Sequence, residues 1–469
     1  MNWHQETIKN RDQFLQDLKE LLRIKSVKDP STASKEAPMG AAVGEALDYM
    51  LKLAEKDGFR TKNIDGYAGY AEMGPEEAEN YIAVLCHVDV VPASSGWSSD
   101  PFEPEIRDGV LFARGAMDDK GPTMAAYYAC KLVNRLGLPL DHRIRIIFGT
   151  DEESGMSCMQ RYMEVEEPPI AGFAPDADFP IIHAEKGQVN IRFSLERTSG
   201  QDGSALKLHS FQAGERANVV PDSASARLTV ERAKAVKDRF AEFCRSTESE
   251  GKASVEDNVL ILTLNGSSAH AMEPDKGTNA GTRLAAFLKK EALDPDGLAY
   301  VSFAALLDDD HFGSRLGIEF SDSITGPLTV NPGILSFNEE EAFIHLNLRM
   351  PVKASYDLTY QRLNQTASEF GFRQSELRER LPHHVEEGHP LIKTLQRVYS
   401  DESGSEPVLL STGGNTYART IPGGVAFGAL FPGTPDTAHQ KDECIPVEEL
   451  IKASSIYARA IFELGRTSF

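Results

Sequence analysis

The sequence is poor in cysteine and has no long apolar segment, and each shortage excludes a class of protein. Its five cysteines among 469 residues are scattered and form no Cys-x-x-Cys pair, which argues against a disulfide framework and a cysteine zinc site. The longest apolar stretches, such as Tyr81–Cys86, are far shorter than the ~20 residues of a membrane span. The first residues, MNWHQETIKNRDQF, lack the apolar core of a secretory signal. We therefore expect a soluble, cytoplasmic protein with reduced thiols.

Basic side chains are also scarce relative to acidic ones. The chain has 49 Lys and Arg residues against 71 Asp and Glu residues, a formal net charge of −22. Such a surface repels nucleic acid and anionic lipid unless it contains a basic patch, and the sequence shows no such patch. We expect neither nucleic acid nor a membrane as a partner.

The N-terminal third alternates helical and strand patterns. Apolar residues recur at helical spacing over residues 14–22, 43–54 and 125–136, the last of these helices following Gly121-Pro122. Continuous apolar runs at Tyr81–Cys86 and Ile144–Phe148 suit strands buried on both faces. Strands that alternate with helices predict an α/β domain whose sheet is at least partly parallel.

The middle of the chain has a different pattern. Period-2 runs, typical of half-buried strands, occur at Val189–Leu195, Ala226–Val230, Val259–Leu264 and Ala342–Leu348. They mix with helical patterns at residues 233–244 and 281–290, which indicates a separate α+β domain. The simplest architecture is an α/β domain made of residues 1–186 and 384–469, with an α+β domain at residues 187–383 inserted between them.

Four short motifs rich in histidine and carboxylate lie where strands are expected to end. They are His87-Val88-Asp89, RGAMDDKGP at residues 114–122, TDEES at residues 150–154 and PDAD at residues 175–178. In an extended chain residues two apart face the same side, so Asp89 can orient the His87 imidazole while the other ring nitrogen binds a metal. Taken singly, each motif has an ordinary alternative: a polar strand end, a helix cap, solvated loop charge or a turn.

Together, and with His439 near the C-terminus, the motifs indicate a metal centre. Histidine and carboxylate are ligands that zinc, manganese and cobalt accept. Two such ions about 3.5–4 Å apart form a known hydrolytic device. Adjacent side chains diverge in TDEES, so that one carboxylate can bind metal while its neighbour acts as a general base.

The order of these motifs resembles that of the M20 metallopeptidases. Longer sequence segments are most similar to those of the PepV-type dipeptidases. They include NVVPD, GSSAHAMEPDKGTNA, LNLRMP and STGGNTYART…FPGTPDTAHQKDE. The resemblance covers nearly the whole chain. It implies an α/β metallopeptidase catalytic domain with an inserted α+β lid domain that replaces a dimer partner, and hence a monomer.

The resemblance also implies the residues of a centre with two divalent metal ions, zinc first, with manganese or cobalt as alternatives. The implied metal ligands are His87, Asp118, Glu153, Asp176 and His439, with Asp119 and Asp178 as alternatives to Asp118 and Asp176. Asp118 bridges both metals, and the family tends to hold the peptide bond after this aspartate in cis. Glu152 is the implied general base, and Asp89 holds His87 in place.

Further resemblance concerns the substrate. His270 matches a histidine that helps hold the developing oxyanion, and Arg349 an arginine that takes the substrate's terminal carboxylate, a task suited to its bidentate fork. Asn218 matches another polar group on the substrate side. The backbone of Gly413 and Gly414 lies near the substrate carboxylate in this interpretation, although Asn415 stands where a threonine is expected.

The function that follows is hydrolysis of dipeptides with a free C-terminal carboxylate. The main alternative is an M20 deacylase that acts on N-acyl amino acids, since it shares the metal centre. A second alternative is an inactive metal-binding or scaffold protein, although a scaffold has no need of Glu152. The sequence does not distinguish the metals, the side-chain preference or the physiological role.

Overall fold

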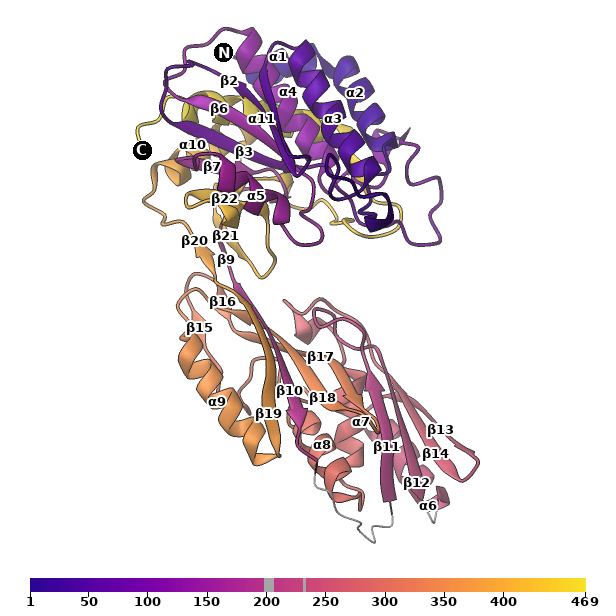
Figure 1. Ribbon diagram of the computed structural model, residues 1–469. Helices are drawn as coiled ribbons and strands as arrows, with labels where there is room; N and C mark the ends of the chain where they lie inside the picture. The colour runs from indigo at the N-terminus through magenta and orange to yellow at the C-terminus, as the bar shows by residue number, and fades with distance from the viewer. Residues whose placement is uncertain (198–205, 231–232) are drawn as a thin grey trace. The chain divides into compact units, whose positions relative to one another are not determined.

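The computed structural model describes residues 1–197, 206–230 and 233–469, which fall into two compact units (Figure 1). Unit 1 comprises residues 1–184, 384–411 and 415–469, and unit 2 comprises residues 185–383 and 412–414. The chain therefore passes between the units four times.

Unit 1 is built on a nine-stranded mixed sheet. Its strands are β1 (Arg60–Ile64), β2 (Ala68–Met73), β3 (Tyr81–His87), β6 (Arg143–Gly149), β7 (Ala171–Ala174), β9 (Ile181–Glu185), β20 (His383–His384), β21 (Leu409–Thr412) and β22 (Gly424–Ala426). They lie in the order β1-β2-β6-β3-β7-β22-β9-β20, with β21 paired to β9. Small side sheets are formed by β4 (Glu105–Arg107), β5 (Val110–Phe112) and β24 (Cys444–Pro446), and by β8 (Ala177–Asp178) and β23 (Ala429–Leu430).

The central strands of this sheet are parallel. β3 runs parallel to β6 on one side and to β7 on the other, and His87 at the end of β3 stands opposite Gly149 at the end of β6. The carboxyl ends of these neighbouring strands therefore meet at one edge, where ligands bind in open α/β sheets.

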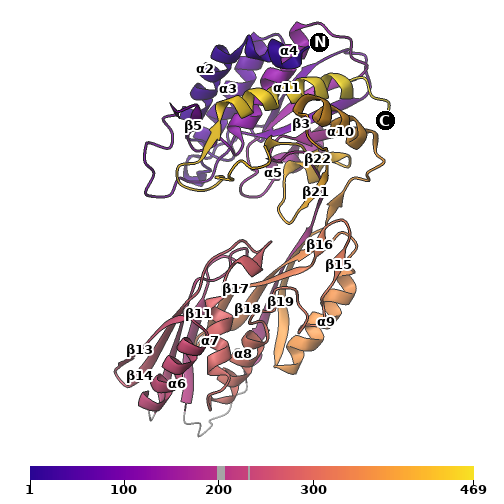
Figure 2. The same ribbon diagram turned by 180° about the vertical axis from the view of Figure 1, so that it is seen from behind.

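Both faces of the sheet are covered. The helices of unit 1 are α1 (Trp3–Ile8), α2 (Arg11–Arg23), α3 (Ala41–Lys56), α4 (Lys120–Arg135), α5 (Ser157–Val165), α10 (Pro390–Ser403) and α11 (Val447–Leu464), with short 3₁₀ turns η1 (Pro30–Thr32) and η3 (Tyr417–Thr420). Ile82 and Val84 of β3 join the core formed with α4 and α11, whereas Ala83 and Leu85 join the core formed with α5 and η3. Figure 2, the view from behind, brings α10 and α11 to the front of this unit.

Unit 2 is an eight-stranded antiparallel sheet with helices. Its main strands are β10 (Gly187–Leu195), β11 (Leu206–Ala213), β12 (Ser223–Val230), β13 (Glu250–Glu256), β14 (Val259–Asn265), β17 (Thr329–Phe337), β18 (Ala342–Met350) and β19 (Phe372–Arg380), and a short hairpin is formed by β15 (Ser321–Asp322) and β16 (Gly326–Pro327). The helices are α6 (Ala233–Ser246), α7 (Ala280–Leu288), α8 (Pro295–Leu306) and α9 (Tyr356–Glu369), with the 3₁₀ turn η2 (Pro274–Lys276). The strand order is β13-β14-β12-β11-β17-β18-β10-β19. Alternate residues such as Leu260, Leu262 and Leu264 of β14 are buried in a core of their own, as a half-covered strand requires.

The predicted α/β fold with an α+β part is confirmed. The apolar runs Tyr81–Cys86 and Ile144–Phe148 are β3 and β6, parallel and buried. The helix expected after Gly121-Pro122 begins earlier, at Lys120, because a proline in the first turn lacks only an N–H that has no partner within the helix. No helix in the three described ranges combines the length and the apolar composition that a membrane span requires.

A buried ion cluster ties β2 to its neighbouring strands. Glu72, 7% exposed, accepts hydrogen bonds from Arg145 Nε at 2.5 Å, Arg143 Nη1 at 3.0 Å and Arg60 Nη2 at 3.1 Å. Burial by itself raises the pKa of Glu72, but the hydrogen bonds and charges of these arginines outweigh it and hold the pKa below its usual range.

The substitution Glu72→Gln is expected to lower the free energy of unfolding at neutral pH by about 3 kcal/mol, because the arginines lose their shared counter-charge. Since the folded-state pKa of Glu72 is lowered, its stabilisation is present above an unfolded-state pKa of about 4.3 and is lost as the pH falls through the folded-state value. Calorimetric melting of both proteins across this range measures the difference. A difference that does not shrink in acid contradicts this account.

Candidate active site

Three neighbouring strands deliver polar side chains to the same edge of the unit 1 sheet. His87 is the last residue of β3, Glu152 and Glu153 follow the end of β6, and Asp176 follows the end of β7. Because β6, β3 and β7 are adjacent and parallel, these side chains converge although the segments are far apart in sequence.

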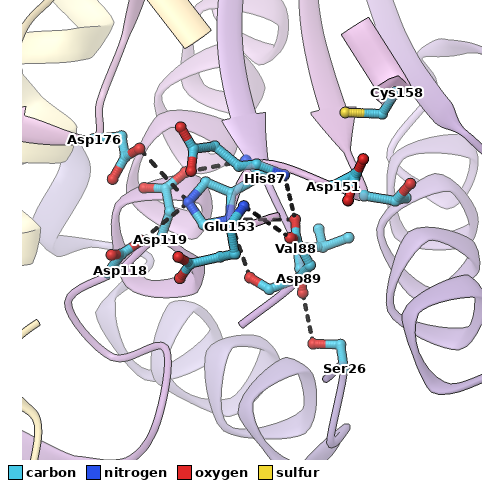
Figure 3. A network of polar contacts seen from close by, with 12 residues as sticks. Ser26, His87, Val88, Asp89, Asp118, Asp119, Asp151, Glu153, Cys158 and Asp176 are labelled. Atoms are coloured by element: carbon cyan, nitrogen blue, oxygen red, sulfur yellow. Dashed lines mark hydrogen bonds and ion pairs between the residues drawn. The ribbon is translucent and has the colours of Figure 1, made fainter. Parts of the chain in front are cut away.

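The His87 imidazole faces two carboxylates. Its Nε2 lies 3.0 Å from Asp118 Oδ1 and 3.6 Å from Asp176 Oδ2, and the side chain is 1% exposed (Figure 3). This buried Nε2 contacts the two carboxylates as an ion pair rather than through a well-directed hydrogen bond. On the other side of the ring, Nδ1 is 3.0 Å from the Asp89 carbonyl oxygen and 3.5 Å from the Asp89 carboxylate. The ring is thus held with its second nitrogen directed at the carboxylates.

A second group of ligand atoms shares Asp118 with the first. His439 Nε2 lies 3.0 Å from Asp118 Oδ2 and 3.0 Å from Glu153 Oε2. The Asp118 carboxylate therefore stands between two imidazoles, one oxygen toward each. In each group the ligand atoms lie within 4.8 Å of one another, as atoms around a single ion do.

The two alternatives left open by the sequence have other surroundings. Asp119 Oδ2 accepts hydrogen bonds from the His87 backbone N–H at 3.1 Å and from the Thr123 hydroxyl at 2.8 Å, so this oxygen anchors β3 to α4. Asp178 belongs to neither group of ligand atoms among the described residues. The Asp118–Asp119 peptide bond is cis, as the resemblance implied.

Asp89 holds more than His87. Its two carboxylate oxygens accept the backbone N–H groups of Glu152 and Glu153, each at 3.2 Å. The main contact to His87 comes instead from the Asp89 carbonyl. Asp89 therefore ties the loop after β6 to the end of β3, a role that the spacing of the His87-x-Asp89 motif does not reveal.

The site concentrates negative charge away from water. Burial, and then the charge of Asp118, raises the pKa of Asp176 to about 6 and of Glu153 to about 7, with the facing histidines opposing both shifts. Burial, and then neighbouring carboxylates, also raises the pKa of Glu152 against the opposing charge of His87. Hydrogen bonds to Asp118 and Glu153 raise the pKa of His439 to about 11. Such crowding favours bound cations.

The donor set fits divalent metal ions. It offers imidazole nitrogen and carboxylate oxygen, the ligands of zinc, manganese and cobalt sites, and no thiolate. The buried Nε2 of His87, without a well-directed hydrogen bond, and the shared carboxylate of Asp118 are the two features that a pair of ions would satisfy. Glu152 Oε1 is also buried without a hydrogen-bond partner, so beside the ligands it stands as a free carboxylate oxygen.

A small cavity adjoins these ligands within unit 1. Its volume is about 170 Å³, and it is lined by Met117, Asp118, Asp176, Ala177, Asp178, Ala429, Leu430, Asp436, Ala438 and Ile445. Pockets for drug-sized ligands measure roughly 300–1,000 Å³. The cavity therefore suits a small group.

The substrate residues expected from the sequence all lie in unit 2, and the structure brings them close to one another there. The Asn218 carbonyl accepts the Ala271 N–H at 3.0 Å, next to His270. Arg349 Nη1 donates to the Gly413 carbonyl at 2.7 Å, and Gly413 in turn lies against Met272. These residues form one cluster within unit 2.

Two supporting residues were missed by the sequence analysis. Asn347 Oδ1 accepts the Arg349 Nε–H at 3.0 Å, and the period-2 spacing of β18 places both on one face, which was the available signal. Glu443 contacts the loop that carries Asp118, more than 300 residues earlier in the chain, and no local sequence pattern predicts that contact.

Comparisons with known proteins agree on one family. The sequence profile of "Peptidase family M20/M25/M40" matches residues 83–463. The chain is 46% identical over 468 residues to "Putative dipeptidase YtjP" of Bacillus subtilis (strain 168), covering 99% of this chain and 100% of that protein. It is 41% identical over 466 residues to a "Putative dipeptidase" of Staphylococcus epidermidis, covering 98% and 99%.

Solved structures share the fold at low identity. The di-peptidase Dug1p from Saccharomyces cerevisiae superposes with a TM-score of 0.58 at 13% identity, covering 100% of this chain and 99% of that one. Human carnosine dipeptidase 1 superposes with a TM-score of 0.55 at 15% identity, covering 99% and 98%.

The geometry distinguishes Asp176 from Asp178, two acidic residues in one short segment. Asp176→Asn is expected to weaken binding of a divalent metal by about tenfold or more, because it removes a charged oxygen facing His87. Asp178→Asn is the matched control and is expected to bind as the wild type does. Zn²⁺ competition against a chromogenic chelator measures both affinities, and equal losses in the two variants contradict the assignment.

Proposed function

This chain belongs to the peptidase family M20/M25/M40, and we propose that it is a metal-dependent dipeptidase of the PepV type. The proposed substrates are dipeptides with a free C-terminal carboxylate. The observation that carries the proposal is the Asp118 carboxylate shared by two groups of ligand atoms, with the unpartnered carboxylate oxygen of Glu152 beside them. The names of the relatives in Bacillus and Staphylococcus support the dipeptidase activity.

The proposed metal ligands are those that the geometry groups. His87, Asp118 and Asp176 would hold one divalent ion, and Asp118, Glu153 and His439 the other. Two ions bound there would supply a water molecule of lowered pKa and a positive charge that polarises the scissile carbonyl. Zinc is the proposed metal, and the same donors accept manganese or cobalt.

Glu152 is the proposed general base. It accepts a proton from the attacking water and later returns that proton to the leaving amine. Burial raises the pKa of its carboxyl group, which makes the carboxylate a stronger proton acceptor. Asp89 holds the backbone of Glu152 and thereby directs its side chain.

Unit 2 supplies the proposed substrate contacts. His270 donates a hydrogen bond to the carbonyl oxygen as negative charge develops on it. Arg349 binds the terminal carboxylate through its guanidinium fork, assisted by Asn218 and by the backbone of Gly413 and Gly414. In this proposal residues 187–383 are a lid domain inserted into a catalytic domain, and the enzyme is a cytoplasmic monomer.

The first test concerns the general base. Glu152→Gln is expected to retain its metals and to lose about 10²–10⁴-fold in kcat, because the amide cannot accept the proton. Metal content by elemental analysis and turnover of one dipeptide are measured on the same preparation. Unchanged turnover removes the general-base assignment.

The second test concerns the substrate class. The Zn²⁺-loaded enzyme is offered one dipeptide with its N-terminus either free or acetylated, and cleavage of the free form alone is expected. Faster hydrolysis of the acetylated form makes the protein a deacylase of N-acyl amino acids with the same metal centre. No turnover of either form, with two metals bound, shows that the substrate class is wrong.

A further inference from the structure

A buried carboxylate near the C-terminus holds the loop that carries Asp118. Glu443 is fully buried, and its Oε1 accepts three backbone N–H groups of this loop. The donors are Gly115 at 3.1 Å, Met117 at 2.9 Å and Asp118 itself at 3.1 Å. Hydrogen bonds to an ionised carboxylate are about twice as strong as those between neutral groups. Because three such hydrogen bonds reach one carboxylate oxygen, they fix the backbone of the loop from Gly115 to Asp118.

The second oxygen of Glu443 is held by a buried arginine. Arg114 Nη1 donates to Glu443 Oε2 at 2.5 Å, and Arg114 Nη2 donates to the Gln440 carbonyl at 3.3 Å. The Arg114 side chain is 1% exposed. The Ala113 N–H also donates to the Glu443 carbonyl at 3.1 Å. The segments 113–118 and 440–443 are thus joined by both side-chain and backbone contacts.

Glu443 lies four residues after His439, and both belong to a loop that hydrogen bonds between Thr437 and Cys444 close. The Thr437 hydroxyl donates to the Cys444 carbonyl and accepts the Cys444 N–H, both at 3.0 Å. His439 has a backbone φ of 62°, in the left-handed region that a non-glycine residue adopts only when its surroundings hold it there. The anchor that holds Asp118 therefore also belongs to the short closed segment that presents His439.

We infer that Glu443 is a positioning residue, which sets the Asp118 carboxylate and the His439 imidazole relative to one another. These two side chains face each other across the second proposed metal position, with His439 Nε2 3.0 Å from Asp118 Oδ2. The hydrogen bonds of Glu443 go to the backbone of the Asp118 loop and to Arg114, so Glu443 acts through the Asp118 backbone and the His439 segment. The inference rests on the proposed two-metal site.

Two double variants separate this positioning from the buried charge pair. Arg114→Met with Glu443→Gln removes both charges but keeps an amide oxygen that accepts the three N–H groups. Arg114→Met with Glu443→Leu removes both charges and the acceptor. Neither double variant leaves an unpaired buried charge. The two therefore differ mainly in whether the side chain at position 443 has an oxygen that accepts the three N–H groups.

Chelator competition measures the Zn²⁺ affinities of both double variants. Visible absorption spectra of their Co²⁺-loaded forms report the ligand geometry. The Leu variant is expected to bind its weaker metal about 10–100-fold less tightly than the Gln variant, with an altered Co²⁺ spectrum. Equal affinities and identical spectra overturn the inference. A wild type that binds no metal refutes the proposed function itself, and the inference with it.

Two single variants complete the test. Glu443→Asp keeps the charge but shortens the side chain, so the Zn²⁺ affinity is expected to fall by about tenfold. This variant decides the question if the Leu variant does not fold, and wild-type affinity in it overturns the inference. Glu72→Gln disrupts a buried ion cluster elsewhere in unit 1 and is expected to lose stability with wild-type metal affinity. If Glu72→Gln loses as much Zn²⁺ affinity as Glu443→Asp, both losses come from general destabilisation. That result also overturns the inference.

Discussion

Repulsion among buried carboxylates is the constraint on which the arrangement of unit 1 depends. The acidic side chains at the site fall into two kinds. Asp89, Asp119 and Glu443 accept backbone N–H groups and fix the segments around the sheet edge. Asp118, Glu153 and Asp176 face imidazoles and fit cations. The first kind holds the second close together against their mutual repulsion, which explains why so much charge is buried in one place.

Much of the fold, and the residues that the structure groups at the candidate site, could be predicted from the sequence. Tyr81–Cys86 reads as a strand because it is apolar on both faces, and His87 follows it directly, so the parallel sheet and the place of the histidine come from the same signal. The resemblance favoured Asp118 and kept Asp119 as an alternative, because two adjacent aspartates differ only in the direction in which the backbone presents their side chains. The structure separates them by their partners.

Supporting contacts were harder to foresee because they are not local. Asp89 was expected to hold His87, and both its carbonyl and its carboxylate face the ring, but the same carboxylate also accepts two N–H groups of the loop after β6, which was not foreseen. Glu443 reads in the sequence as one more acidic residue in an acidic chain. Its function as an anchor depends on a contact between distant segments, which neither periodicity nor spacing encodes.

The chain order of these segments has a consequence for biosynthesis. Domains form as units while the ribosome adds residues from the N-terminus. The unit 1 sheet, however, pairs β7 with β22, and Glu443 holds the loop before α4. Neither contact can form until residues 424–443 have been synthesised. Unit 2 is synthesised in the interval. During translation the Asp118 loop therefore lacks its anchor and its facing histidine, and the proposed hydrolytic centre can form only after His439 and Glu443 have been synthesised.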